Sequence, residues 1–189
     1  MPHSPRLEGS SLYLRGLDHV DASKAYSDWL NNPQVNRYLE TRHEKQSIQS
    51  IKNFITDKNK SKNEYLFGIF LKLHNKHIGN IKLGPIRKQH KLAEISLFIG
   101  ETSEWGKGYA TEAINIITNH AFNDMKMNKL VASMYAEIKI STRAFISAGW
   151  KEEAILKDHY LFNGKPMDLI IVGITAQQYY KNSPEKNPV

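Results

Sequence analysis

The stretch EWGKGYATEAI, residues 104–114, constrains the fold more than any other part of the chain. The run AEISLFIG, which has the composition of a strand, precedes it, and a long segment with helical periodicity follows it. A plain turn between a strand and a helix needs one glycine, whereas this connection has Gly106 and Gly108. Because a glycine has no Cβ, it lets another group approach the backbone closely. The stretch therefore predicts a strand–turn–helix unit whose backbone comes close to a ligand.

A phosphate group fits such a turn. The first N–H groups of a helix lack internal partners, and the helix dipole adds roughly half a positive charge there. Gly106 and Gly108 would let phosphate oxygens reach these N–H groups, and Lys107 can add charge at the rim. A purely structural turn explains the same two glycines, so this alternative stays open here. The pattern is not a P-loop, and Thr111 stands where a dinucleotide-binding fingerprint has its third glycine.

Periodicity along the rest of the chain predicts one domain of mixed α and β elements. Strands are predicted at residues 11–15, 65–73, 77–86, 91–99, 129–138, 152–162 and 167–175, the last two joined by the turn Asn163-Gly164. Helices are predicted at residues 20–30, 33–37, 47–57, 108–122 and 141–150, with Ser141 as the N-cap of the last. The order indicates an α/β (α+β) domain over residues 1–181, with a disordered tail over residues 182–189.

Composition narrows the classes of function. The 189 residues include no cysteine, which excludes disulfides, thiolate metal ligands and a cysteine nucleophile and fits a cytoplasmic location. No apolar run approaches the roughly 20 residues that span a bilayer, so no membrane partner is expected. The net charge of +7 suits an anionic ligand. The basic clusters DKNKSKNE (residues 57–64) and IRKQHK (residues 86–91) are interpreted as solvated loops, so no nucleic-acid partner is expected.

The segment WGKGYA after AEISLFIG resembles the acyl-CoA-binding motif of the GNAT N-acetyltransferases, Q/R-x-x-G-x-G/A. Gly108 and Ala110 match its fourth and sixth positions. Trp105 replaces the usual Gln or Arg, as in the branch that includes the ribosomal-protein N-terminal acetyltransferases. Four further segments in the same order resemble that branch: LYLRGLDHVDASKAYSDWLNNPQVNRYLE, IGNIKL, STRAFISAGWKEEA and HYLFNGKPMDLIIVGI. The resemblance implies a single-domain GNAT fold with a central mixed, mostly antiparallel and splayed sheet flanked by helices.

The resemblance also implies acetyl-CoA as the donor, an amine as the acceptor, and no metal. The strand at residues 94–99 is expected to splay from the strand at residues 130–137 and to admit the pantetheine arm. The implied cofactor contacts are backbone groups of Leu97, Phe98 and Ile99 for pantetheine, and Trp105, Gly106, Lys107, Gly108, Tyr109, Ala110 and Thr111 for the pyrophosphate. The acceptor amine would attack the thioester directly, with a backbone N–H near Phe98 polarising the carbonyl.

The candidate catalytic residues are two glutamates and one serine. Glu94 and Glu137, one on each splayed strand, are candidate general bases, and solvent-facing carboxylates are an equal alternative. Many family members use a Tyr as the acid, but Phe145 occupies that position here. Ser141 matches the serine of the branch's N-x-x-S element and is the candidate acid, although Ile138 replaces the asparagine of that element.

The acceptor site is expected to include Tyr38, Tyr160 and Asp168. The favoured acceptor is a primary amine of a small molecule, with a preference for a nucleotide-linked amino sugar, and a protein N-terminus is an alternative. A non-catalytic acyl-CoA-binding sensor of the same fold also remains open, because Ile138 and Phe145 depart from the family pattern. The sequence is compatible with a homodimer and does not determine the oligomeric state.

Overall fold

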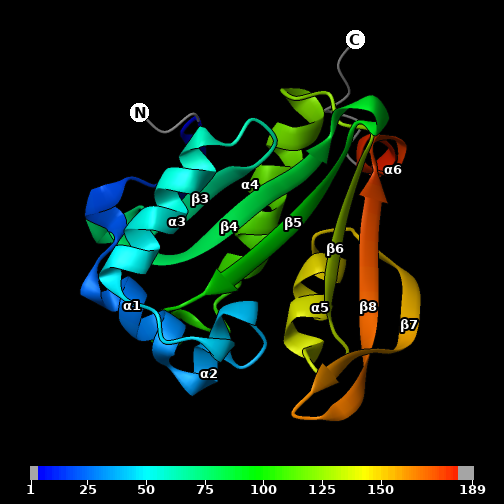
Figure 1. The fold of residues 1–189 in the computed structure, drawn as a ribbon. Helices are drawn as coiled ribbons and strands as arrows, with labels where there is room; N and C mark the ends of the chain where they lie inside the picture. The colour runs from blue at the N-terminus through cyan, green and yellow to red at the C-terminus, as the bar shows by residue number, and fades with distance from the viewer. Residues whose placement is uncertain (1–3, 183–189) are drawn as a thin grey trace.

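A computed structural model describes residues 4–182 of the chain. Eight strands form one sheet in the order β1-β2-β3-β4-β5-β6-β8-β7, with helices on both faces (Figure 1). The strands are β1 (Leu7–Glu8), β2 (Leu12–Gly16), β3 (Tyr65–Leu71), β4 (Lys76–Arg87), β5 (Leu92–Ile99), β6 (Lys129–Tyr135), β7 (Lys151–Phe162) and β8 (Lys165–Thr175). The α-helices are α1 (Lys24–Asn31), α2 (Pro33–Asn36), α3 (Ile48–Lys60), α4 (Tyr109–Asn123), α5 (Lys139–Ser147) and α6 (Ala176–Asn182).

The sheet opens between β5 and β6, which are neighbouring parallel strands. These two strands pair only at Leu92↔Lys129, Ala93↔Leu130 and Glu94↔Val131. Beyond Glu94 they diverge, and Figure 1 shows them side by side at the upper end and apart at the lower end. β6 stays paired with β8 as far as Tyr135. The expected splayed, mostly antiparallel mixed sheet is therefore confirmed.

Two apolar cores explain why the strands read as continuous hydrophobic runs. Alternate residues of one strand point to opposite faces of a sheet, and both faces of this sheet are covered. Leu12 and Leu14 of β2 belong to the core beneath α4, whereas Tyr13 between them packs in the core beneath α1 and α3. The run YLFGIFL of β3 is buried on both sides for the same reason.

The element boundaries differ from the sequence prediction at one important place. β6 ends at Tyr135, not at residue 138, because the Ile138 N–H donates back to the Tyr135 carbonyl at 2.9 Å and turns the chain. α5 consequently starts at Lys139 with Ile138 in the N-cap position. Ser141 is thus the third residue of the helix, and its predicted role as the N-cap is wrong.

The two ends of the chain add elements that periodicity did not predict. β1 pairs with β2 at the sheet edge, and α6 contacts β8 and extends to Asn182. The tail that the sequence predicts to be disordered starts at Asn182, but this residue is the last of α6. The rest of that tail, residues 183–189, lies outside the described residues. The turn Asn163-Gly164 is confirmed as a hairpin turn, since both residues have positive φ, 50° and 76°.

Candidate active site

The two glycines of the opening stretch form an open backbone cradle at the start of α4. Gly106 and Gly108 have φ values of +76° and +83°, in the left-handed region, and an added Cβ at either one would meet no atom within 4 Å. Gly108 is the N-cap residue of α4, and no side chain caps this end of the helix. Ser23 and Ser47, in contrast, cap α1 and α3. The α4 N-terminus therefore leaves backbone N–H groups available beside empty space, which fits a pyrophosphate.

The charge at the rim of this cradle is neutralised. Glu104, only 11% exposed in its side chain, binds Lys107 at 2.7 Å and Lys76 at 3.3 Å. The hydrogen bond from Lys107 lowers the pKa of Glu104. A cavity of about 610 Å³ adjoins the loop and is lined by these three residues, Tyr109 and the turn between β3 and β4. Anion binding here would rest on backbone N–H groups and the helix dipole more than on Lys107.

Backbone directions along β5 follow from two hydrogen bonds at its ends. The Lys91 carbonyl accepts from the Asn128 N–H on the β6 side, and the Gly100 N–H donates to Ile78 on the β4 side. Because successive residues of a strand direct their backbone groups to opposite sides, Leu97 and Ile99 face the splay. Phe98 faces β4, with Asn80 as its register partner, so the expected contribution of the Phe98 backbone to the splay is corrected to Leu97 and Ile99.

Trp105 links the cradle to the end of β5. Its indole Nε1–H donates to the Ile99 carbonyl at 2.8 Å, although the side chain is 45% exposed. At the other side of the loop, Thr111 of α4 donates a long hydrogen bond, 3.5 Å, to the Ala144 carbonyl of α5. The predicted cofactor residues 105–111 therefore contact the open edge of β5 at one end and α5 at the other.

The two candidate bases lie in different environments. Glu94 sits where β5 and β6 are still paired, and its carboxylate is 3.9 Å from Arg87. It does not lie at the opening, because the strands diverge only after this residue. Glu137, two residues beyond the end of β6, accepts a hydrogen bond from the Tyr38 hydroxyl at 2.8 Å and is about half exposed. Of the two carboxylates, Glu137 is the one at the open end.

Ser141 occupies the first turn of α5 at the same end of β6. Its side chain is half-buried, and no side-chain hydrogen bond of residues 4–182 involves its hydroxyl. The neighbouring Thr142 hydroxyl, in contrast, contacts Met134 Sδ at 3.2 Å and the Ile138 carbonyl at 3.4 Å. The Ser141 hydroxyl is thus the one in this turn without an intramolecular partner.

Aromatic side chains from three distant segments gather at the open end. Tyr38 stacks on Phe162 with ring centroids 5.1 Å apart, and Tyr135 lies 5.8 Å from Tyr38 and 5.3 Å from Tyr160. The Tyr135 hydroxyl donates to Glu40 at 2.7 Å. Burial, reinforced by this bond, raises the pKa of Tyr135.

Two guanidinium groups line the same cluster. Arg37 lies 5.1 Å above the Tyr38 ring, and Arg42 lies 5.4 Å above the Tyr135 ring, both within cation–π range. Arg42 also donates to the Tyr135 hydroxyl at 3.1 Å. Sequence reasoning did not name Tyr135, Glu40 or Arg42 individually, although Glu40 and Arg42 lie within four residues of the predicted acceptor residue Tyr38.

Asp168, a predicted acceptor residue, lies apart from this cluster. It binds Lys157 at 2.8 Å and accepts the Asp158 N–H at 3.0 Å. Its neighbour Leu169 is the register partner of Tyr135, and adjacent residues of a strand point to opposite faces. Asp168 therefore points away from the face that carries Tyr135, and its expected place in the acceptor site is corrected.

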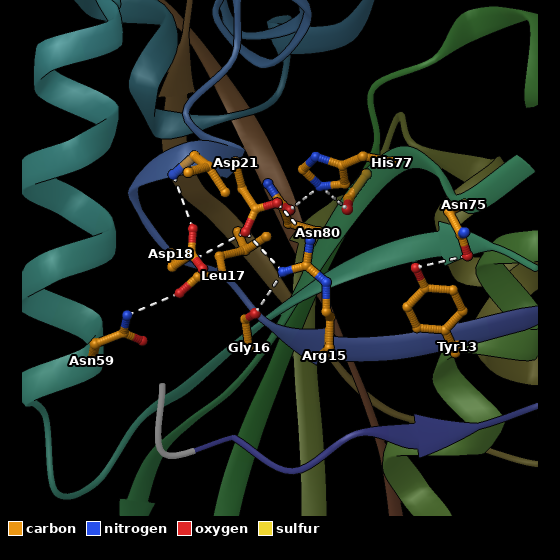
Figure 2. A network of polar contacts seen from close by, with 12 residues as sticks. Tyr13, Arg15, Gly16, Leu17, Asp18, Asp21, Asn59, Asn75, His77 and Asn80 are labelled. Atoms are coloured by element: carbon orange, nitrogen blue, oxygen red, sulfur yellow. Dashed lines mark hydrogen bonds and ion pairs between the residues drawn. The ribbon is translucent and has the colours of Figure 1, made fainter. Parts of the chain in front are cut away.

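A buried polar network lies beneath α1, close to the end of β5 (Figure 2). His77 Nε2 donates to the Gly79 carbonyl at 3.0 Å and to Asn80 Oδ1 at 2.9 Å. The His77 ring also packs against Tyr26 and Trp29 of α1, and Trp29 covers Gly100. The network thus holds α1 against the strand that borders the splay.

A bidentate ion pair completes this network. Arg15 binds Asp21 at 2.8 and 2.7 Å. Burial favours the neutral form of Asp21, but the hydrogen bonds from Arg15 and Asp18 hold its pKa below the usual range. Burial lowers the pKa of His77, while the bond to Asn80 opposes this shift. His77 is therefore neutral in the folded protein near pH 7.

The buried, neutral His77 should make the folded protein sensitive to acid. Since the folded pKa of His77 lies below the unfolded value of about 6.5, unfolding takes up a proton at lower pH. We expect the free energy of unfolding to fall below pH 6.5 by up to about 1.4 kcal/mol per pH unit. Urea unfolding of His77→Gln between pH 7.5 and 5.0 should show a shallower fall. The exposed His159→Gln serves as the control. An unchanged slope in His77→Gln would contradict the prediction.

Comparisons with known proteins identify the family of this chain. The chain matches the family described as Acetyltransferase (GNAT) domain over residues 11–151. It is similar to the uncharacterised N-acetyltransferase YoaA of Bacillus subtilis (strain 168), with 27% identity over 173 residues, covering 90% of this chain and 96% of that protein. Within the described residues, no helix is long and apolar enough to cross a membrane, and no cluster of His, Asp and Glu suits a metal ion.

Solved structures show the same fold. An acetyltransferase (GNAT family) from Bacillus anthracis superposes with a TM-score of 0.80 at 20% identity, covering 92% of this chain and 99% of that chain. Spermidine N-acetyltransferase from Vibrio cholerae, in complex with CoA and spermine, superposes with a TM-score of 0.79 at 22% identity, covering 89% of this chain and 98% of that chain.

Proposed function

The chain belongs to the GNAT family and is an N-acetyltransferase, and from this premise we propose that it moves the acetyl group of acetyl-CoA directly to a primary amine of a small molecule. The observation that carries the proposal is the continuity of the glycine cradle with the open edge of β5, which Trp105 joins through its bond to Ile99. We further assign the chain to the branch that includes the ribosomal-protein acetyltransferases, because Trp105 replaces the usual Gln or Arg.

Each part of the reaction has a candidate group at the open end. Acetyl-CoA supplies an activated acyl carbon whose oxygen gains negative charge as the amine attacks. The Leu97 N–H faces the splay and would stabilise that charge. Glu137, held by Tyr38, would take the proton of the amine, and Ser141 would donate one to the leaving sulfur. Glu94 has no part in this arrangement, because it lies in the closed part of the sheet.

For the acceptor, we propose a nucleotide-linked amino sugar. The rings of Tyr38, Tyr135 and Tyr160 provide surfaces for stacking on a base or a sugar. Arg37 lies 3.6 Å from Glu137, and its side chain is more than half exposed. Its guanidinium is therefore free to reorient and bind a phosphate of the acceptor. One structural neighbour was solved with spermine, which makes polyamines the alternative acceptors to test.

An amine panel tests this function. Release of free CoA thiol from acetyl-CoA would be measured with nucleotide-linked amino sugars, polyamines, aminoglycosides and peptides with free N-termini. We expect turnover with an amino sugar, and a lower rate when its diphosphate is removed. Tight acetyl-CoA binding without turnover on any amine would favour the non-catalytic sensor. Turnover only with polyamines or peptides would replace the proposed acceptor.

Replacing Ser141 separates catalysis from helix stability. Because the Ser141 hydroxyl caps no backbone group, Ser141→Ala should leave the melting temperature nearly unchanged. We expect kcat to fall roughly 10²-fold, as for the loss of a general acid, with the acetyl-CoA KM unchanged. Thr142→Val is the control, since it removes a hydroxyl that contacts Met134 and Ile138 instead. Full kcat in Ser141→Ala would leave the serine without a catalytic role.

A further inference from the structure

Two basic segments that are distant in sequence meet at one end of the sheet. They are the connection from α3 to β3 and the turn from β4 to β5, both at the upper end of Figure 1. The Ile86 N–H donates to the Asn63 carbonyl at 2.8 Å and joins them. An open cavity of about 480 Å³ lies between them, lined by Lys62, Asn63, Ile86, Arg87, Lys88, Gln89 and His90.

The cations of this cavity are not neutralised within the protein. Among the ion pairs of residues 4–182, none involves Lys62 or Lys88, and both side chains are exposed. Arg87 has only a distant partner, Glu94 at 3.9 Å. The nearby Glu64 is already bound by Lys58 and by Lys82, the latter at 3.0 Å. The cavity therefore carries an uncompensated positive charge.

This cavity is separate from the candidate active site. It lies before the first residue of β5, whereas the glycine cradle follows the last residue of the same strand. β5 has 8 residues, so the two ends of the strand are roughly 25 Å apart at about 3.3 Å per residue. Acetyl-CoA in the splay does not account for positive charge at the opposite end of the strand.

Although the sequence alone favours solvated loops for these two clusters, we propose that the basic cavity between them binds the phosphate backbone of a nucleic acid without reading its bases. Lys62 and Lys88 are flexible point charges that can bind phosphate oxygens without a fixed geometry, and the guanidinium of Arg87 also suits a phosphate. Apart from the exposed imidazole of His90, the lining has no aromatic ring on which a base could stack, and the single 3-10 turn at Lys88–His90 is too short to enter a groove. The net charge of +7 supports attraction of a polyanion. RNA and DNA share this backbone chemistry.

Binding to defined oligonucleotides tests the proposal. Fluorescence anisotropy would be measured with a labelled single-stranded RNA, a DNA of the same sequence, and polyglutamate, at low and moderate salt. We expect Kd values of about 10⁻⁴–10⁻⁶ M for the nucleic acids, with log K falling by about 2 per decade of salt for three phosphate contacts. A preference for RNA or for DNA would identify the source of the backbone and support the proposal.

A matched pair of variants locates the surface. Lys62→Glu/Lys88→Glu should weaken nucleic-acid binding more than tenfold and leave acetyl transfer unchanged. Lys45→Glu/Lys165→Glu makes the same change in charge at exposed lysines elsewhere and should weaken binding less than threefold. Lys62→Gln/Lys88→Gln repeats the test if the charge reversal impairs folding. Equal losses in both pairs, no binding at low salt, or binding of polyglutamate alone would overturn the proposal.

Discussion

Leu97→Pro is expected to abolish most of the acetyl transfer while the protein remains folded. Proline removes the N–H of this residue, which faces the splay and has no partner in β6. Since the β4 ladder uses Phe98 and not Leu97, the hydrogen bonds between β4 and β5 are retained. Loss of one donor to a developing oxyanion lowers kcat by roughly 10²–10³-fold. Steady-state kinetics with acetyl-CoA and the best amine of the panel measure this effect.

Two controls separate the N–H from the side chain and from the strand. Leu97→Ala keeps the N–H and removes packing against the core, so it should lower stability but retain kcat within about tenfold. Phe98→Pro removes a backbone donor toward β4 and should unfold the protein. If Leu97→Pro and Leu97→Ala lose the same activity, the backbone of Leu97 does not act on the acyl group.

Gly108→Val is expected to remove most of the affinity for acetyl-CoA. The side chain would enter the empty space beside the α4 N-terminus, where the pyrophosphate is proposed to bind. We expect Kd for acetyl-CoA to rise roughly 100-fold, equivalent to about 2.7 kcal/mol. Isothermal titration calorimetry measures this change directly, without an amine.

Gly149→Val is the matched control for backbone strain. Gly149 has φ +86° and open space at its Cβ, as Gly108 does, but it follows α5 at the chain's entry to β7. A non-glycine residue in this region costs about 1–2 kcal/mol, so both variants should lose similar melting temperature. Only Gly108→Val should lose acetyl-CoA binding. Equal affinities in the two variants would show that the cradle does not hold the pyrophosphate.

The proposed binding sites for the donor and the acceptor depend on different parts of the protein. Backbone groups of β5 and of the α4 N-terminus dominate the donor end, and Lys107 there is neutralised by Glu104. Side chains of the segment after α2, of β6 and of β7 dominate the proposed acceptor end. If the proposed sites are correct, we therefore expect substitutions around Tyr38 to change the preferred amine without weakening acetyl-CoA binding.

The sequence by itself determined most of the fold and the location of the cradle. These features are local: the period of the apolar residues identifies strands and helices, and Gly106 and Gly108 follow directly on a strand. The sequence did not predict those ends of strands and helices that depend on a single backbone hydrogen bond. The turn after Tyr135, which places Ile138 instead of Ser141 at the start of α5, is one of them.

Only the tertiary structure decided which residues meet. Glu94 and Glu137 are the same residue type and both were candidate bases. The pairing of β5 and β6 closes the sheet at Glu94, however, and leaves Glu137 at the opening. Tyr38, which follows α2, meets Tyr135 at the end of β6, and Lys62 and Lys88 line one cavity although they belong to two different connections. Such contacts depend on which strands pair and where the pairing stops, and the spacing of residues within one segment does not show which distant segment it will meet.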